Sequence, residues 1–502
     1  MATEEKTMTA PEQEQELDLS EQRRIRREKL AKLQAEGRDP FLITRFDRTM
    51  KSKEVIDGFD ALEGSTQKLA GRIMSLRDMG KASFCDIMDQ DGRIQIYVRI
   101  DELGEEEYKR FTQLDIGDII GVTGQVFKTR RGQISIHADE VILLSKSLIP
   151  LPDKWSGIKD IDMRYRQRYV DLIMNQDVRD TLIKRTKAIS AIRRYFDNLG
   201  YLEVETPILQ TVKGGASARP FITHHNALNL DMYLRIATEL HLKRCIVGGM
   251  ERVYEIGRIF RNEGMDTKHN PEFTTIEFYE SYTNLEGMME RTEGMMKQVA
   301  MEVCGTDQLP FGDVVIDFSK PFERITMTEA VKKYSGVDFD QIPDTAAAKK
   351  AADEHHIQYE DRHEKGDILA MFFDEYAEDK LIQPTFVLEH PIEISPLTKK
   401  CPDKPGMTER FELFVCGSEF ANAYSELNDP LDQRKRFEDQ MRLKNLGDEE
   451  ASDQDEDFLL AVEYGLPPTG GCGIGVDRFV MLLTNSVSIR DVLLFPTMKP
   501  LD

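Results

Sequence analysis

Two alternating segments separated by a long polar loop restrict the fold of this chain more than any other stretch. "RVYEIGRIF" (252–260) precedes the loop and "FTTIEFY" (273–279) follows it. Such alternation is typical of half-buried strands, and "NEGMDTKHNP" between them predicts a β-hairpin. We expect Arg261 and Glu263 to share one face of the first strand, and Glu277 and Tyr279 one face of the second. A hairpin with only a charged tip would not need charges at strand positions.

Composition predicts a multidomain globular protein. A chain of 502 residues is long enough for two or more domains with sizeable cores. Its 40% hydrophobic and 31% charged residues are typical of a soluble protein. No apolar run approaches the roughly 18 residues of a membrane span, and the acidic N-terminus does not resemble a signal peptide. The six cysteines lack CxxC spacing, which favours free thiols and a cytoplasmic location.

Charge is unevenly distributed along the chain. The net charge of −23 argues against indiscriminate binding to nucleic acid. However, "RRIRREKLAK" (23–32) is basic, and "GDEEASDQDEDF" (447–458) carries seven acids and no base. Such runs are usually solvated faces. An acidic protein can still bind RNA through one local patch.

The pattern divides the chain into three regions. Residues 1–66 are predicted to hold a disordered N-terminus (1 to about 18), a charged helix (about 20–36) and a linker. Residues 67–150 show five strands with one helix after the third, which suits an OB-fold barrel. OB-folds bind single-stranded nucleic acid, but they also serve as protein-docking modules. Residues 151–502 form a large region of mixed helices and strands, in which about 287–385 reads as a helical insertion.

Three segments of the large region carry a family resemblance. They are "GYLEVETPIL" (200–209), the hairpin 252–279, and the glycine-rich "GGCGIGVDRF" (470–479). In this order they resemble the three signature motifs of class II aminoacyl-tRNA synthetases. With "GGASARPFITHHNALNLDMYLRIATELHLKR" (214–244) and the barrel, the chain resembles bacterial-type lysyl-tRNA synthetases, of class IIb, from about Asp39 onward. The resemblance implies an α+β fold: an OB-fold anticodon-binding domain, and a six-stranded antiparallel catalytic sheet flanked by helices and carrying the helical insertion. It also implies a homodimer built partly through the first motif.

The resemblance implies a two-step reaction. L-lysine and ATP would give lysyl-adenylate and pyrophosphate, and lysine would then pass to the 3′-terminal ribose of tRNA(Lys). Activation brings anions together, so catalysis depends on positioning and on neutralisation by cations and up to three Mg²⁺ ions. Arg261 and Arg478 are the implied catalytic residues, since a guanidinium suits bidentate phosphate contacts. The implied ATP contacts are Arg261, Glu263, Lys268, His269, Asn270, Phe273, Gly473, Gly475 and Arg478. At Lys268 many relatives carry arginine, and a lysine supplies a point charge instead of a planar fork.

A second hairpin predicts a metal site. "RFELFVCGSEFANAYSELNDP" (410–430) should turn near 416–418 and bring Glu412 close to Glu419. Neighbouring carboxylates repel unless a cation lies between them, and oxygen ligands suit Mg²⁺ bound to phosphates. The family uses the matching pair in this way. Glu419 is out of phase with Asn422, so a bulge must redirect it.

The substrate assignment depends on charge. Two acids, Glu277 and Glu426, are expected beside Tyr279, and they suit a buried ammonium group. Aspartyl and asparaginyl enzymes share the fold, but aspartate would need a cation here; an arginine substrate is not excluded by charge. With the family's assignments added, the implied lysine contacts are Gly215, Glu239, Arg261, Glu277, Tyr279, Asn422, Tyr424 and Glu426.

In the barrel, Arg77, Phe84 and Gln95 match the positions through which relatives read the anticodon. A guanidinium, an aromatic ring and an amide are the expected tools for unstacked RNA.

Two rival functions predict different sequences. A truncated paralogue that modifies a translation factor would typically lack the barrel. A non-enzymatic regulator would carry broken motifs, yet Arg261, Glu412, Glu419 and Arg478 are all present.

Overall fold

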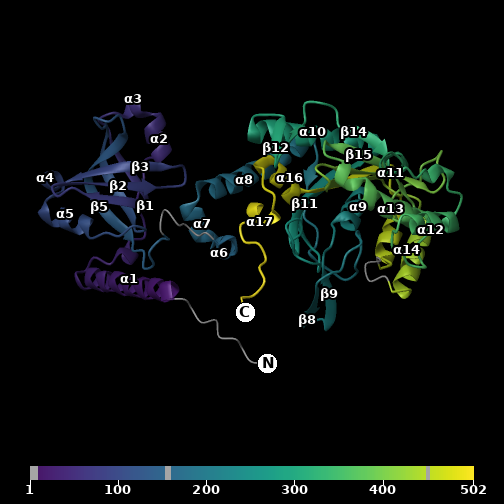
Figure 1. Ribbon diagram of the computed structural model, residues 1–502, viewed down its shortest axis with the longest axis horizontal. Coiled ribbons are helices and arrows are strands. Elements are labelled where there is room, and N and C mark those ends of the chain that lie inside the picture. Colours follow the sequence, from purple (N-terminus) through teal and green to yellow (C-terminus); the bar gives the residue numbers. More distant parts are fainter. Residues whose placement is uncertain (1–9, 153–159, 448–452, 502) are drawn as a thin grey trace. The chain divides into compact units, whose positions relative to one another are not determined.

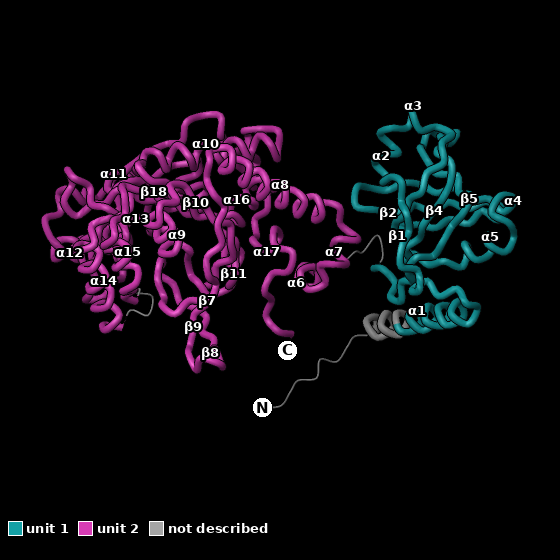
Figure 2. Tube along the Cα trace, turned by 180° about the vertical axis from the view of Figure 1, so that it is seen from behind, with its two compact units in different colours: residues 1–159 teal, residues 160–502 magenta. Residues whose placement is uncertain are grey.

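The computed structural model describes residues 10–152, 160–447 and 453–501. The chain separates into two compact units, residues 1–159 and 160–502 (Figures 1 and 2). Part of the predicted acidic run, residues 448–452, lies outside the described residues.

The first unit begins with helix α1 (Ala10–Ala35). The prediction of disorder up to about residue 18 is therefore wrong for residues 10–18, and residues 1–9 lie outside the described part. The helix ends at the predicted place, because Gly37 adopts a φ of +71° that disfavours other residues. Three short helices occupy the expected linker: η1 (Pro40–Leu42), α2 (Ser52–Asp57) and α3 (Phe59–Leu62).

Five strands close into the predicted OB-fold barrel, in the order β1-β2-β3-β5-β4. The elements are β1 (Thr66–Asp78), β2 (Ala82–Met88), β3 (Arg93–Arg99), α4 (Ile100–Leu103), α5 (Glu105–Thr112), β4 (Ile119–Lys128) and β5 (Ile134–Ser145). Gly104, with a φ of +85°, divides the predicted helix into α4 and α5. Alternate residues such as Leu69, Ile96 and Val122 fill the barrel interior.

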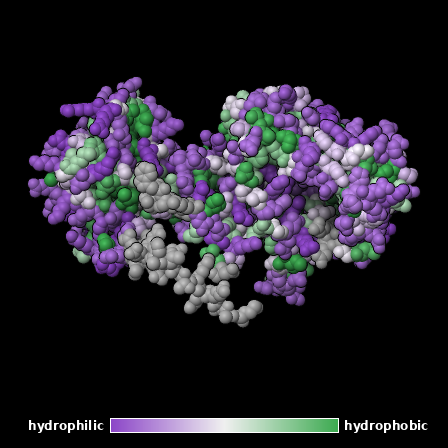
Figure 3. All heavy atoms as spheres, in the orientation of Figure 1, coloured by the Kyte–Doolittle hydropathy of each residue, from purple (hydrophilic) through white to green (hydrophobic). Residues whose placement is uncertain are grey.

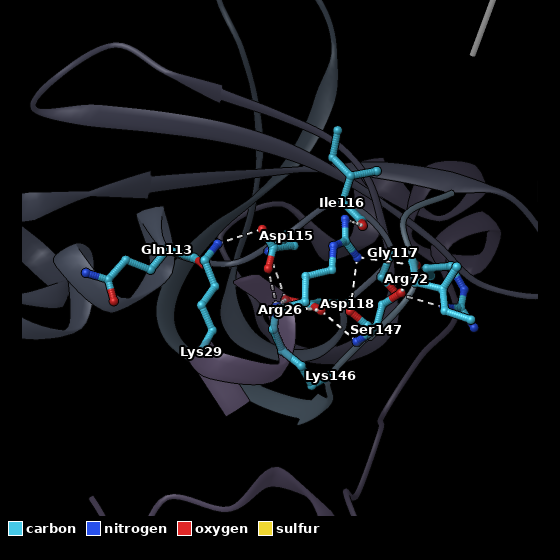
Figure 4. A network of polar contacts seen from close by, with 11 residues as sticks. Arg26, Lys29, Arg72, Gln113, Asp115, Ile116, Gly117, Asp118, Lys146 and Ser147 are labelled. Atoms are coloured by element: carbon cyan, nitrogen blue, oxygen red, sulfur yellow. Dashed lines mark hydrogen bonds and ion pairs between the residues drawn. The ribbon is translucent and has the colours of Figure 1, made fainter. Parts of the chain in front are cut away.

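A polar network attaches α1 to the barrel (Figure 4). Arg26 donates hydrogen bonds to the carbonyl oxygens of Ile116 and Ser147, both at 3.0 Å. Lys29 contacts Asp115 at 2.7 Å. Two cations of the basic run therefore hold the helix in place, and only part of that run remains exposed for a partner.

Eight strands form the main sheet of the second unit, in the order β14-β15-β16-β17-β18-β11-β10-β6. They are β6 (Leu202–Glu203), β10 (Arg252–Phe260), β11 (Glu272–Ser281), β14 (Glu323–Thr326), β15 (Thr385–Pro391), β16 (Met407–Phe414), β17 (Glu419–Ser425) and β18 (Thr469–Gly475). The six strands from β15 to β10 pair antiparallel, which confirms the expected sheet. A parallel strand is added at each edge, β14 beside β15 and β6 beside β10.

Helices α8 (Gln176–Asn198), α10 (Leu285–Cys304) and α16 (Val476–Thr484) pack together on the sheet and share its largest hydrophobic core. A second core joins α9 (Glu239–Val247), α14 (Pro430–Asn445) and α15 (Glu456–Glu463) to β10 and β11. Short helices α6 (Ile161–Arg166), α7 (Arg168–Met174) and α17 (Ile489–Val492) complete the unit. Strands β7 (Leu209–Gln210), β8 (Ile222–His225) and β9 (Leu230–Leu234) form a small sheet that projects from this unit (Figures 1 and 2).

The predicted helical insertion is more varied than expected. Its later part does form a helical lobe with its own core, made of α11 (Met327–Ser335), η2 (Phe339–Gln341), α12 (Thr345–Glu354), α13 (Lys365–Tyr376) and η3 (Glu378–Lys380). However, α10 belongs to the main core, β12 (Gln308–Phe311) pairs with β13 (Val314–Asp317), and β14 joins the main sheet. The sequence interpretation overlooked these strands because each is only four residues long.

Within the described residues, no helix is long and apolar enough to cross a membrane. The face shown in Figure 3 is mostly hydrophilic, with separate hydrophobic patches. All six cysteines are free, as expected from their spacing.

Candidate active site

A cavity of about 460 Å³ lies against the central strands of the second unit. Its walls come from β11, β16, β17 and β18, together with the N-terminal end of α9 and the loop between β10 and β11. The cavity brings together all but one of the residues predicted for lysine, ATP and metal in this unit. These are Gly215, Glu239, Arg261, Glu263, Lys268, His269, Asn270, Phe273, Glu277, Tyr279, Glu412, Glu419, Asn422, Tyr424, Gly473, Gly475 and Arg478.

The acidic end of the cavity centres on Glu277. Its carboxylate accepts hydrogen bonds from the Thr238 backbone N–H at 3.0 Å and from the Tyr279 hydroxyl at 3.2 Å. The predicted common face of Glu277 and Tyr279 is therefore confirmed. Burial, with a smaller contribution from Glu239, raises the pKa of Glu277 to about 7. A cation bound beside this carboxyl group would favour its ionised form.

Glu426 is the predicted residue that does not line the cavity. It follows the end of β17, is fully buried, and lies 2.5 Å from Nζ of Lys243. The same ammonium lies 2.6 Å from Oε1 of Glu239. Sequence reasoning missed Lys243, although its place four residues after Glu239 in "ELHLKR" is a signal for a helical ion pair.

Gly471 leaves room for Glu426 beside Tyr279, next to the cavity wall. A Cβ atom at this position would lie 2.1 Å from Oε1 of Glu426 and 2.3 Å from Cε1 of Tyr279. Only glycine lets both side chains approach the strand so closely. The sequence interpretation singled out Gly473 and Gly475, where an added Cβ would meet atoms no closer than 3.4 Å.

The cationic end of the cavity holds Arg261 and Arg478. Arg261 lies over the Phe273 ring, 5.3 Å from its centre, and its buried Nε has no partner among the described residues. The predicted common strand face of Arg261 and Glu263 is wrong, because β10 ends at Phe260. There the chain leaves the sheet, and the N–H of Asn262 bonds to the carbonyl of Arg219.

The loop after β10 is ordered by its own polar groups. Asp266 accepts backbone hydrogen bonds from Lys268 at 2.6 Å and His269 at 2.7 Å. Asn270 donates to the carbonyl of Glu272 and accepts from the Thr497 N–H. The Asn270 side chain thus holds the loop. The Lys268 side chain lines the cavity and forms no hydrogen bond or ion pair with another described residue.

The second hairpin contains the predicted bulge. Glu412 pairs with Asn422 across β16 and β17, and the register then shifts, so that Phe414 pairs with Glu419. Burial, and next the nearby charge of Glu412, raises the pKa of Glu419. Arg410, which was not predicted, contacts Glu412 and lies 3.1 Å from Asn422 Oδ1.

This carboxylate pair suits Mg²⁺. Both side chains line the cavity near its arginines, and Mg²⁺ typically uses one or two carboxylates together with substrate phosphates and water. No group of three or more potential metal ligands occurs in the described residues.

In the barrel, a row of side chains crosses neighbouring strands. The register pairs Arg77 with Phe84, Phe84 with Tyr97, and Tyr97 with His137. The Phe84 and Tyr97 rings lie 4.7 Å apart, and Phe127 lies within 6 Å of Tyr97 and His137. Sequence reasoning missed three of these rings, although each belongs to a predicted strand.

Gln95 differs from the other two barrel predictions. It is only 5% exposed and accepts a hydrogen bond from Ser135 at 3.1 Å. Arg77 is more than half exposed and lies 3.8 Å from Asp86. Arg77 is therefore accessible to a ligand and Phe84 is partly accessible, whereas Gln95 is almost fully covered.

The comparisons with known proteins agree with this geometry. Residues 160–499 match the family described as tRNA synthetases class II (D, K and N). Residues 67–144 match the OB-fold nucleic acid binding domain. The fold and the matched family together define a class II aminoacyl-tRNA synthetase.

Individual relatives identify the family within this class of synthetases. A lysine–tRNA ligase of Thermoanaerobacter sp. (strain X514) is 57% identical over 483 residues, covering 96% of this chain and 97% of the relative. One from Clostridium tetani (strain Massachusetts / E88) is 55% identical, covering 100% of this chain and 99% of the relative. The chain belongs to the lysine–tRNA ligase family.

Proposed function

We propose that this protein is an ATP-dependent ligase that activates L-lysine and transfers it to tRNA(Lys). The observation that carries the proposal is the arrangement of charge in the cavity: Glu239 lies beside Glu277, whereas Arg261 and Arg478 both lie near Glu419. Lysine has two ammonium groups and one carboxylate. ATP has a polyanionic chain. The cavity offers each of them groups of opposite charge.

The lysine site uses both ends of the amino acid. Glu277, Tyr279 and Glu426 receive the side-chain ammonium, with Tyr424 as a neighbouring wall. Glu239 and the backbone at Gly215 receive the α-amino group. Arg261 holds the carboxylate with help from Asn422. A buried ammonium needs such partners, because leaving it unpaired costs several kcal/mol.

The ATP site occupies the cationic end. Phe273 offers a ring for stacking on adenine, and Glu263, His269 and Asn270 surround the nucleotide. Arg261, Lys268 and Arg478 neutralise phosphates, while Gly473 and Gly475 leave room on the strand. Glu412 and Glu419 would hold Mg²⁺, which supplies charge neutralisation on the phosphates; the family suggests up to three ions.

The first step follows from these positions. The lysine carboxylate attacks the α-phosphorus, the bond to the β-phosphate oxygen breaks, and pyrophosphate leaves. Arg261 aligns the two anions and offsets charge in the transition state. The 3′-terminal ribose hydroxyl of tRNA(Lys) then attacks the carbonyl of the adenylate and releases AMP.

The barrel would recognise the anticodon through Arg77, Phe84 and Gln95. We also propose a homodimer formed partly by the first motif. Three of its apolar residues, Leu202, Ile208 and Leu209, are 44–52% exposed in the single chain, as a subunit interface would require. Because charging of tRNA serves protein synthesis, the proposed location is the cytoplasm.

ATP–pyrophosphate exchange with each of the twenty amino acids tests the proposal. Lysine should support strong exchange without tRNA, and tRNA(Lys) should then be charged. The same family includes enzymes for aspartate and asparagine. Exchange that peaks with either would overturn the assignment, because aspartate would face the carboxylates of Glu239 and Glu277.

Glu426→Gln gives a second test. It should raise the KM for lysine and leave that for ATP almost unchanged. Loss of one partner of a buried pair costs about 3–5 kcal/mol, or roughly two to four powers of ten. An unchanged KM for lysine would remove Glu426 from the site.

A further inference from the structure

Lys243 is a fully buried ammonium group that the proposed reaction does not yet use. It lies on α9, with Nζ 2.6 Å from Oε1 of Glu239 and 2.5 Å from Oε2 of Glu426. The Phe458 ring centre is 5.9 Å from Nζ. Burial opposes its charge, but Glu239 and Glu426 outweigh burial and raise the pKa of Lys243. The side chain is therefore held as a cation.

The ammonium connects two acids that have different places in the site. Glu239 lines the cavity, whereas Glu426 is covered and lies over Gly471 beside Tyr279. Lys243 contacts Oε2 of Glu426, and Oε1 has no hydrogen-bonding partner among the described residues. An atom added to Gly471 would fall 2.1 Å from Oε1. Lys243 thus holds Oε2 of Glu426, and Oε1 lies next to Gly471 in the cavity wall.

The charges of this region do not balance without a ligand. Glu239, Glu277 and Glu426 are each at most 9% exposed. Burial, and next the charge of Glu239, raises the pKa of Glu277, and burial with the charges of Glu239 and Glu277 raises that of Glu426. Among the described residues, Lys243 is the one cation that forms an ion pair with any of these three carboxylates. With all three carboxylates ionised, it leaves two net negative charges. Lysine brings two ammonium groups, and its carboxylate is assigned to Arg261.

We propose that Lys243 is a positioning residue that sets the charge of the amino-acid site. Its ammonium fixes Glu239 and Glu426 at the two ends of the substrate and removes one of three negative charges, so that the remaining two match the diammonium form of lysine. This inference rests on the proposed lysine site. Lys243 contacts no substrate atom; it acts through the two carboxylates.

A purely structural role would give a different result. An ion pair that only fixed α9 would affect the stability of the fold, and not the pH at which lysine binds. If Lys243 sets the charge, its removal leaves three buried carboxylates without an internal cation. The pKa of Glu426, which burial already raises, then rises further, so that the site holds more protons at pH 7 than in the wild type and loses affinity for an ammonium group until the pH rises.

Other ionisable groups around the acids do not interfere with this readout. Tyr279 on β11, Tyr424 on β17 and Cys472 on β18 face them, and burial raises the pKa of each, to about 12 for Cys472. At the start of α15, Asp455 and Asp457 pair with Arg244. Between pH 6.5 and 9.5, the proton uptake of the site therefore comes from the glutamates.

The test compares Lys243→Met with the wild type in ATP–pyrophosphate exchange across this pH range. Near pH 7 the KM for lysine should rise about tenfold for each unit by which the pKa of the stranded carboxyl is raised. The KM for ATP should stay within about twofold, since the affected groups lie away from the phosphates. The lysine defect should diminish as the pH rises towards 9.5.

Lys297→Met is the matched control. Lys297 pairs with Glu293 at 2.6 Å, four residues apart on α10, and so repeats the helical spacing of Lys243 and Glu239 away from the cavity. It should leave the KM for lysine and its pH profile unchanged. Should Lys243→Met not fold, Lys243→Gln replaces it, because an amide can still donate hydrogen bonds without a charge. It should show the same pH-dependent defect.

The double variant Lys243→Met/Glu426→Gln completes a double-mutant cycle for these two residues. If Lys243 acts through Glu426, the KM for lysine of the double variant should exceed that of Glu426→Gln by no more than about threefold, since the effects of coupled residues do not add. A KM for lysine that is unchanged in Lys243→Met, or a defect equal at pH 7 and 9.5, overturns the inference. Failure of the lysine site itself would look different: Glu426→Gln alone would then leave the KM for lysine unchanged.

Discussion

Nη2 of Arg478, near the start of α16, lies 3.3 Å from Nε2 of His269 in the loop between β10 and β11. The same guanidinium donates from Nη1 to the carbonyl oxygen of Glu419 at 2.5 Å. One side chain of the third motif thus contacts both the hairpin loop and the carboxylate hairpin. A phosphate placed here would meet a preformed planar donor.

Arg478→Lys should therefore lose almost as much ATP–pyrophosphate exchange activity as Arg478→Ala. A lysine keeps the charge but cannot hold the loop and a phosphate at once. We expect the exchange rate to fall by about 10²–10³-fold, the usual loss for one preorganised donor to developing charge. Arg434→Ala, which removes an exposed ion pair with Glu456, is the control. Near wild-type rates in Arg478→Lys would show that charge alone suffices.

Glu412→Ala and Glu419→Ala test the metal assignment. Each should abolish adenylate formation while circular dichroism and oligomeric state stay as in the wild type. Higher Mg²⁺ concentrations should partly restore the weaker variant, because its site still has one carboxylate. Calorimetric titration of Mg²⁺ with ATP present should show weakened binding. Wild-type exchange in either variant would remove the pair from catalysis.

The sequence could predict the elements whose signals are local. Alternation and turn residues located the five barrel strands and both hairpins, because each strand there spans at least seven residues. The phase of Asn422 and Tyr424 even required the bulge that the structure contains near Glu419. The order of the three motifs supplied the rest of the site.

Long-range pairing could not be predicted in this way. Lys243 pairs with Glu426 across 183 positions, and Arg410 turns back onto Glu412 and Asn422 only because the strands carry them to one face. The short strands β12 to β14 have too few residues for a periodic signal. Crowding at Gly471 depends on side chains from two other segments, so no local sequence signal pointed to this glycine.

The raised pKa of Glu277 predicts a pH dependence of lysine binding. Its value of about 7 in the folded protein exceeds the ordinary 4.5, so the folded chain binds more protons between these values than the unfolded chain. Stability from this group is therefore lost as the pH rises from about 4.5 to about 7. Bound lysine favours the ionised form and offsets that loss.

Thermal unfolding with and without lysine should show the effect. The increase in Tm caused by lysine should be larger at pH 8 than at pH 6, and calorimetry at pH 6 should detect proton release on binding. Glu277→Gln should weaken both dependences. An equal increase in Tm at the two pH values would show that Glu277 does not change its protonation when lysine binds.

Gly471→Ala should disturb the site more than Gly473→Ala on the same strand. The new Cβ would meet Glu426 and Tyr279 at 2.1 and 2.3 Å, whereas at Gly473 the closest atom would be Cγ of Glu277 at 3.4 Å. Overpacking of a core costs about 1–3 kcal/mol. Denaturant unfolding should show that loss for Gly471→Ala, together with a raised KM for lysine. Equal stability of the two variants would contradict the crowding argument.

The aromatic row of the barrel gives the last prediction, which separates tRNA recognition from lysine activation. Phe84 stacks near Tyr97 and pairs in register with Arg77, so a base placed on it would have a cation beside it. Phe84→Ala should leave ATP–pyrophosphate exchange unchanged and weaken tRNA(Lys) charging. Base–aromatic stacking is worth about 1–3 kcal/mol, which corresponds to a rise of some 5- to 150-fold in the KM for tRNA.

Phe41→Ala, at an exposed ring in η1 outside the row, is the control and should charge tRNA normally. Gln95→Ala should change anticodon discrimination less than Phe84→Ala changes affinity, because Gln95 is largely buried and already bonded to Ser135. Normal charging by Phe84→Ala would make the row a structural feature of the barrel and leave the anticodon to another surface.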